Sequence, residues 1–150
     1  MESLRIVGAR VWLGQESGWR VTDVVCRDGL IDAVGPQHAP TPSRTINAEG
    51  LWLIPGVIDP QAHFRDPGAA YNEDLRTGSI ACAAGGVTTF FDMPNTAPPA
   101  TSPELIVQKQ MLAADKSIVN FAFFIGATVD NVADLNAARG VCGIKVFMGS

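Results

Sequence analysis

The segment DPQAHFRDPG, residues 59–68, follows the apolar run LWLIPGVI and holds side chains suited to chemistry. Side chains alternate along an extended backbone, so Gln61, His63 and Arg65 are expected on one face. Two histidines at the spacing of positions 61 and 63 would make a good metal pair. Glutamine offers only a neutral carbonyl oxygen, which is a weaker ligand for zinc. The segment therefore predicts one imidazole beside a guanidinium that suits a carboxylate or phosphate.

Each of these side chains also fits a structural role. A lone histidine such as His63 is compatible with a hydrogen-bonded structural residue. Arg65 fits a surface ion pair with Asp66 or Glu73. The residues alone leave both alternatives open. Their place after an apolar strand favours function, because sites in parallel sheets gather at the C-terminal ends of strands.

Two further segments carry candidate residues. In DMPNT, residues 92–96, Asn95 either belongs to an ordinary turn or points its amide into a pocket at the strand ends. Lys145 lies in GIKVFMG, and lysine is almost never fully buried unless it is paired. It is either an edge lysine whose amine reaches water, or an interior lysine whose pKa falls. The neutral amine of an interior lysine is a nucleophile or base, or it combines with carbon dioxide to form a carbamate that bridges two metal ions.

The elements that must position these residues fall into two groups. Residues 1–53 predict a small β-rich domain, with a two-residue hairpin turn at Asp28-Gly29, a Pro-rich loop over 36–44 and one strand over 45–54. From residue 54 the pattern becomes β-α-β-α-β-α-β, which predicts a parallel sheet covered by helices. We expect one helix to be capped by Asn72 and to end at Gly85-Gly86.

The second predicted helix begins at Ser102, which is followed by proline at the first helical position, and a third helix spans 130–139.

Composition supports a globular chain, because 47% of the 150 residues are hydrophobic and 17% are charged. The net charge of −4 and the absence of any Lys/Arg run argue against nucleic-acid or membrane partners. We expect the three cysteines to be buried, reduced thiols in a cytoplasmic protein.

Three segments together resemble the N-terminal part of dihydroorotases, within the amidohydrolase superfamily of cyclic amidases. They are GVIDPQAHFRDPG, EDLRTGSIACAAGGVTTFFDMPNT and GIKVFMGS, in this order. The resemblance implies an α/β fold, the first half of a (β/α)8 TIM-type barrel preceded by a small β-rich domain. Residues 54–150 would hold the first four β/α units. The start of the chain, residues 1–53, is similar to the small β domain that flanks these barrels.

The resemblance also implies a site and a reaction. One or two zinc ions would be bound where relatives carry a histidine pair, with glutamine in the first place of that pair. Arginine and asparagine would hold the carboxylate of dihydroorotate, which is reversibly hydrolysed to N-carbamoyl-aspartate in pyrimidine biosynthesis. The implied roles are metal ligation by His63, Lys145 as a carbamate and, more weakly, Gln61; support behind the ligands by Asp59; and substrate binding by Arg65 and Asn95. The general base would lie beyond residue 150.

Other interpretations stay open at this stage. The chain also fits an allantoinase-like or hydantoinase-like amidase, or a non-catalytic homologue that supports aspartate transcarbamoylase after losing metal ligands. A third interpretation is a small open α/β domain that binds an anion near Arg65. A closed barrel needs about 250 residues, so residues 1–150 either belong to a longer product or must pair with another half, and we expect no turnover by them alone. We also expect a homo-oligomer.

Overall fold

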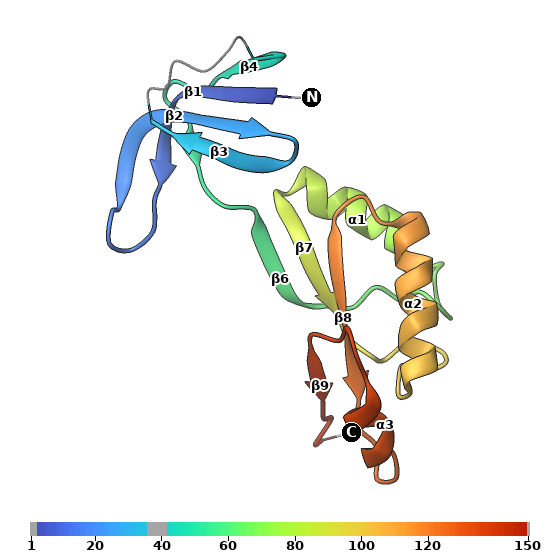
Figure 1. Ribbon diagram of the computed structural model, residues 1–150. Helices are drawn as coiled ribbons and strands as arrows, with labels where there is room; N and C mark the ends of the chain where they lie inside the picture. Colours follow the sequence, from blue (N-terminus) through green and yellow to red (C-terminus); the bar gives the residue numbers. More distant parts are fainter. Residues whose placement is uncertain (1–2, 36–41, 150) are drawn as a thin grey trace. The chain divides into compact units, whose positions relative to one another are not determined.

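The computed structural model describes residues 3–35 and 42–149 and divides the chain into two compact units, Met1–Pro55 and Gly56–Ser150. Figure 1 shows the order of strands and helices along the chain. The central part of the predicted Pro-rich loop, residues 36–41, lies outside the described residues. Each unit is described by itself below.

Among its described residues, the first unit holds a five-stranded sheet in which β1 (Ser3–Trp12) and β2 (Trp19–Arg27) pair antiparallel. The hairpin from β2 to β3 (Leu30–Val34) is confirmed, because Asp28 and Gly29 both have the positive φ that such a turn requires. The single strand expected over 45–54 is wrong. It is interrupted by a turn at Gly50 and forms β4 (Arg44–Asn47) and β5 (Trp52–Leu53), both parallel to β1.

The second unit alternates strands and helices, as the sequence predicts. Its described residues form one parallel sheet in the order β6 (Val57–Ala62), β7 (Val87–Asp92), β8 (Asn120–Gly126) and β9 (Gly143–Lys145). The connecting helices are α1 (Leu75–Ala84), α2 (Pro103–Lys116) and α3 (Val132–Ala137). Four consecutive parallel strands with helical connections are the arrangement of half a (β/α)8 barrel, which confirms the expected fold class.

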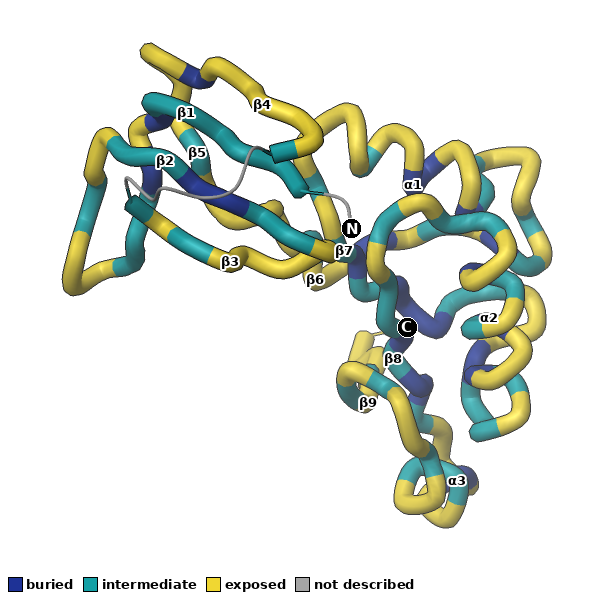
Figure 2. The backbone as a smooth tube through the Cα atoms, turned by 45° about the horizontal axis from the view of Figure 1, so that its top comes forward, coloured by how far each residue is buried: buried dark blue, intermediate teal, exposed yellow. Residues whose placement is uncertain are grey.

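The core of this unit lies between the sheet and its helices. Figure 2 colours the buried segments of this unit dark blue. Phe90 and Phe123 from the sheet meet Leu75 of α1 and Ile106 of α2, and all four are buried. Burial of an aromatic or aliphatic side chain of this size contributes roughly 1.5–3 kcal/mol. One face of the sheet is therefore fixed to the helices, and the other face is left for a site.

The helix ends differ in part from the prediction. Ser102 caps α2 as predicted, and its hydroxyl accepts a hydrogen bond from the Leu105 amide. The cap of α1 is Asp74, not Asn72, because its carboxylate lies 2.7 Å from the Thr77 amide and so satisfies an exposed N–H of the first turn. The third helix is shorter than 130–139 and begins after Asn131.

The expectation about cysteines is also corrected. All three are free thiols, but Cys26 and Cys82 are only partly buried and Cys142 is exposed. Cys142 lies just before β9, at the edge of the described sheet, where no further strand covers it. No helix in the described residues is long and apolar enough to cross a membrane.

Candidate functional site

Strand pairing and side-chain alternation indicate that Gln61, His63 and Lys145 lie on the face of the sheet that carries no helix. Ala62, Asp92 and Phe123 are paired across β6, β7 and β8, and their side chains point to the helices. Because successive side chains alternate, Gln61 and His63 point to the opposite face. Ile125 belongs to the core, so its neighbour Gly126 and the paired Lys145 face the same way as His63. The parallel strands also bring their C-terminal ends to one edge.

His63 has a defined partner at this edge. Its Nδ1 lies 3.0 Å from Oδ1 of Asn95, in the loop after β7. An amide oxygen only accepts hydrogen bonds, so in the neutral imidazole this contact places the proton on Nδ1 and leaves the lone pair on Nε2. The contact therefore fixes the tautomer that leaves Nε2 able to bind a metal ion, as a partner on the other ring nitrogen commonly does.

Asp59, Gln61 and His63 also line a shallow hollow at the outer edge of β6, where the sheet borders Cys82 of α1 and Glu73 of the segment before it. The Asp59 carboxylate accepts a hydrogen bond of 2.9 Å from the Gln61 amide, so it holds the backbone at position 61. Burial raises the pKa of the Cys82 thiol, and the nearby carboxylates of Asp59 and Glu73 raise it further. Cys82 is thus kept in the neutral, unreactive form.

Arg65 and Lys145 are accessible to solvent. Arg65 is exposed, and in the described part of the chain it forms an ion pair with neither Asp66 nor Glu73. Its structural alternative is therefore not realised. Lys145 is half-buried, and its Nζ lies 5.3 Å from the centre of the Phe147 ring. Both side chains are therefore accessible to a ligand, Lys145 from the open face of the sheet and Arg65 from the loop after β6.

A buried ion pair joins α2 to the end of β7, and no local sequence pattern predicts which two residues form it. Lys109 of α2 and Asp92 at the end of β7 are 2% and 0% exposed, and Nζ lies 2.6 Å from Oδ2. Oδ1 of Asp92 accepts from the Phe64 amide, and Nζ of Lys109 donates to the Met93 carbonyl. Burial raises the pKa of the Asp92 carboxyl and lowers that of the Lys109 amine, whereas their mutual attraction opposes both shifts.

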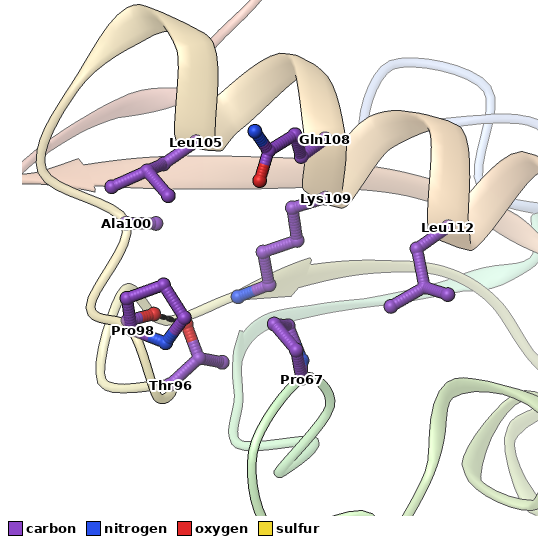
Figure 3. Close-up of a pocket in the computed structure, with 8 residues that line it drawn as sticks. All are labelled: Pro67, Thr96, Pro98, Ala100, Leu105, Gln108, Lys109 and Leu112. Atoms are coloured by element: carbon purple, nitrogen blue, oxygen red, sulfur yellow. Dashed lines mark hydrogen bonds between the residues drawn. The ribbon is translucent and has the colours of Figure 1, made fainter.

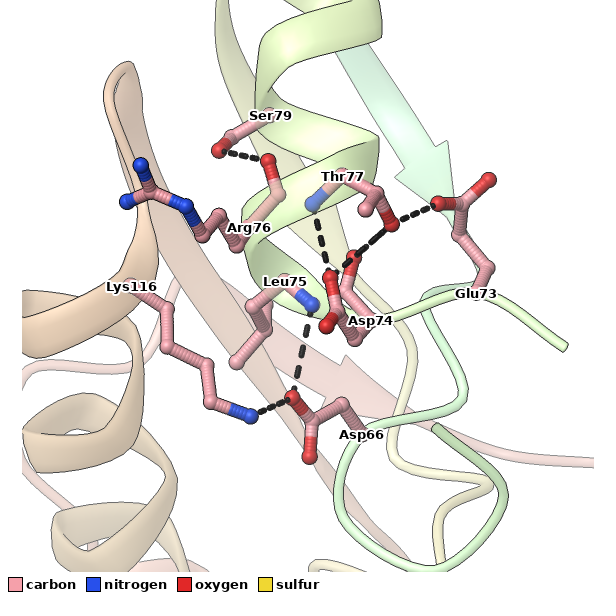
Figure 4. Close-up of polar contacts among 8 residues, drawn as sticks. All are labelled: Asp66, Glu73, Asp74, Leu75, Arg76, Thr77, Ser79 and Lys116. Carbon is pink, nitrogen blue, oxygen red and sulfur yellow. Dashed lines mark hydrogen bonds and ion pairs between the residues drawn. The ribbon is translucent and has the colours of Figure 1, made fainter. Parts of the chain in front are cut away.

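Lys116, a second lysine of α2, binds Asp66, the residue directly after Arg65 in the loop that follows β6. Nζ of Lys116 lies 2.6 Å from Oδ2 of Asp66, and the same oxygen accepts from the Leu75 amide (Figure 4). This hydrogen-bonded partner raises the pKa of the Lys116 amine.

The burial of Lys109, unlike its pairing with Asp92, does have a signal in the sequence. Lys109 lies three residues after Ile106 and four before Ala113, both of which are buried, so it occupies the apolar face of its helix.

A partly enclosed pocket is separate from the candidate residues. It has a volume of about 260 Å³ and lies between α2 and the loops after β6 and β7, as Figure 3 shows. Its walls are mainly apolar and include Pro67, Pro98, Leu105 and Leu112, with the stem of Lys109 crossing between the loops and the helix. None of the residues predicted for chemistry lines it.

The donor set fits part of a metal site. In the described residues no group of three or more His, Cys, Asp or Glu side chains is placed to hold a metal ion. His63 offers a free Nε2, Lys145 offers an amine and Gln61 a neutral oxygen on the same face. These residues fit a divalent ion only when further ligands complete the set.

Comparison with known proteins agrees with this geometry. The model of the Amidohydrolase family matches residues 52–143. An allantoinase of Solibacter usitatus is 42% identical over 137 residues, which cover 89% of this chain and 30% of that protein. A dihydroorotase of Methanothermobacter thermautotrophicus is 46% identical over 108 residues, covering 71% of this chain and 25% of that protein.

Solved structures give the same result. An L-hydantoinase (dihydropyrimidinase) from Arthrobacter aurescens superposes with a TM-score of 0.85 at 28% sequence identity, over 96% of this chain and 32% of that one. The chain therefore spans about a third of the length of the proteins that it matches.

Proposed function

The chain belongs to the amidohydrolase family, and we propose that it forms the first half of the active site of a hydrolase that opens a cyclic ureide of the allantoin type. The Solibacter allantoinase matches 89% of this chain, whereas the Methanothermobacter dihydroorotase matches 71% and a dihydroorotase of Methanosarcina acetivorans 85%, so coverage favours the allantoinase only slightly. The single observation that carries the proposal is the His63–Asn95 contact on the helix-free face, because it leaves one imidazole nitrogen ready to bind a metal ion.

In the proposed site His63 and Lys145, the latter as a carbamate, hold a divalent ion, for which zinc is our choice, and Gln61 adds a neutral oxygen. When bound, such an ion polarises the ring carbonyl and lowers the pKa of water. Water adds to the carbonyl carbon, the ring C–N bond breaks, and the departing nitrogen takes a proton. The residues of this chain orient the ring: Arg65 donates to an exocyclic oxygen, and the amide nitrogen of Asn95 donates to another.

Dihydroorotate is the second candidate substrate, and Arg65 is the observation that favours it. Its guanidinium is exposed and is not engaged by Asp66 or Glu73, which suits bidentate binding of a free carboxylate. Allantoin carries no carboxylate, so the two substrates place different demands on this side chain.

The test is an assay of the complete gene product, purified with Zn²⁺, on allantoin, hydantoin and dihydroorotate. We expect kcat/KM to be highest for allantoin, and we expect residues 1–150 alone to show no turnover. Arg65→Gln should lower kcat/KM for dihydroorotate by roughly 10–100-fold, because a hydrogen bond to a charged group is worth about 1.5–3 kcal/mol. It should change the value for allantoin much less.

A preference for dihydroorotate would replace the first candidate by the second. No turnover of any of the three rings by a protein that binds zinc would contradict both. Absence of zinc as well as turnover would instead support a non-catalytic homologue, and binding to aspartate transcarbamoylase would then be the next measurement.

A further inference from the structure

We propose that α2 positions the candidate site through two lysines, which hold the backbone at Phe64, directly after His63, and at Asp66, directly after Arg65. Lys109 and Lys116 lie seven residues apart, two turns of helix, and therefore on one face of α2. Each binds an aspartate that contacts or belongs to the segment 63–66. The proposal rests on the proposed function for the role of His63, but not for the substrate.

The first lysine acts through Asp92. Its ammonium is enclosed by Oδ2 of Asp92, the Met93 carbonyl at 2.9 Å and the face of the Phe123 ring at 4.9 Å. Asp92 in turn accepts a hydrogen bond of 2.9 Å from the backbone amide of Phe64, the residue directly after His63. The chain of contacts thus runs from the helix, through the sheet end, to the backbone beside the imidazole.

The second lysine acts on the residue directly after Arg65. Lys116 binds Asp66, which also accepts a hydrogen bond from the backbone amide of Leu75 at the start of α1. The backbone of Arg65 is held at the same point, because its amide donates to the Glu73 carbonyl. Segment 63–66 is therefore held at Phe64 by Lys109 acting through Asp92, and at Asp66 by Lys116.

Stability alone gives no reason for a buried lysine and aspartate here. Replacing a buried ion pair by apolar side chains of similar volume is often neutral or stabilising, since desolvation of two charges offsets their attraction. An apolar residue at position 92 would, however, leave the Phe64 amide without its acceptor. The specific contribution of Asp92 is therefore this hydrogen bond, and that of Lys109 is to keep the acceptor charged and in place.

Two double variants separate these contributions: D92N/K109M and D92L/K109M. Both remove the buried charges, but only the first keeps an oxygen that can accept from the Phe64 amide. The readouts are thermal unfolding, hydrogen exchange of the Phe64 amide and the ¹⁵N shifts of the His63 ring, none of which needs turnover. Q108M, which changes an exposed neighbour of Lys109, is the control and should change none of them.

We expect the Phe64 amide to exchange at least tenfold faster in D92L/K109M than in D92N/K109M, and His63 to lose its Nδ1–H tautomer only in D92L/K109M. Equal exchange and equal ring shifts in the two variants would overturn the proposal. If D92L/K109M does not fold, variants of Lys116 provide the test. K116M should speed hydrogen exchange of the Arg65 and Leu75 amides, and K116R should return their exchange to the original rate. Unchanged exchange in K116M would also overturn the proposal. Failure of the hydrolase assay leaves all of these readouts intact, so the two proposals fail separately.

Discussion

Gly78→Ala tests whether α1 is shaped to fit the loop that carries His63. Gly78 lies in the middle of α1, where alanine would be favoured by about 1 kcal/mol from helix propensity. In the structure a Cβ at this position would lie 2.6 Å from Cδ1 of Phe64 and nearer still to Cε1. The Phe64 ring has little room to retreat, because it packs edge-on against the fully buried Phe90 with centroids 4.6 Å apart. The glycine therefore makes space for a ring next to the site.

The magnitude follows from two opposing terms. Overpacking a filled core costs typically about 1–3 kcal/mol, against the gain of about 1 kcal/mol in helix propensity. We expect net destabilisation of about 1 kcal/mol, which lowers Tm by roughly 4–8 °C in a unit of this size. The sign is the important point, since propensity alone predicts stabilisation.

Thermal unfolding followed by circular dichroism measures this effect. Gly85→Ala is the matched control, because a Cβ there meets nothing closer than the Ala81 carbonyl at 3.5 Å and the residue has a negative φ. Phe64→Leu should relieve the clash, so Gly78→Ala should be much less harmful in that background. If Gly78→Ala raises Tm, or costs the same in both backgrounds, the close fit between α1 and the loop is not what the structure indicates.

Two further predictions follow from other parts of the chain. Gly68→Ala should lower Tm by more than Gly78→Ala does, because Gly68 has φ +108° and a Cβ there would lie 2.6 Å from the Ala97 carbonyl; a melt at or above that of Gly78→Ala would contradict this. The hydrogen bond from Arg5, followed by that from the Gly8 amide, lowers the pKa of Asp23, so its stabilising contribution is present above the unfolded pKa near 4 and is lost as pH falls through the lower folded value. Asp23→Asn should therefore flatten the acid side of a curve of unfolding free energy against pH, and an unchanged acid side would refute the assignment.

The fold was largely predictable because its signals are local. The alternation of apolar strands with capped helices predicts the parallel sheet, and Ser102-Pro103 marks the start of α2 correctly. The start of α1 was predicted two residues too early, because Asn72, Glu73 and Asp74 are all suitable near a helix start. Only the contact of Asp74 with the Thr77 amide distinguishes them, and composition does not show which side chain makes it.

For the candidate site, the sequence predicts residues but not the contacts between them. Period-two alternation was enough to place Gln61 and His63 on one face, and strand order was enough to bring Asn95 to the same edge. The contact from His63 to Asn95 joins residues 32 positions apart, and that from Lys116 to Asp66 joins residues 50 apart. Pairings over such distances depend on how helices are seated against the sheet, which a local pattern does not describe.

The role of Asn95 shows how the observed contact and the predicted one fit together. Its carbonyl oxygen accepts from His63 Nδ1, so that oxygen is not available to a ligand. Its amide nitrogen has two hydrogens and makes no hydrogen bond within the described residues. A substrate oxygen, whether a ring carbonyl or a carboxylate, needs a donor and not an acceptor. One side chain can therefore fix the tautomer of the imidazole with its oxygen while its nitrogen binds substrate. In the proposed site this division of roles would matter all the more because position 61 is a glutamine, which leaves His63 as the one imidazole to be oriented for a metal ion.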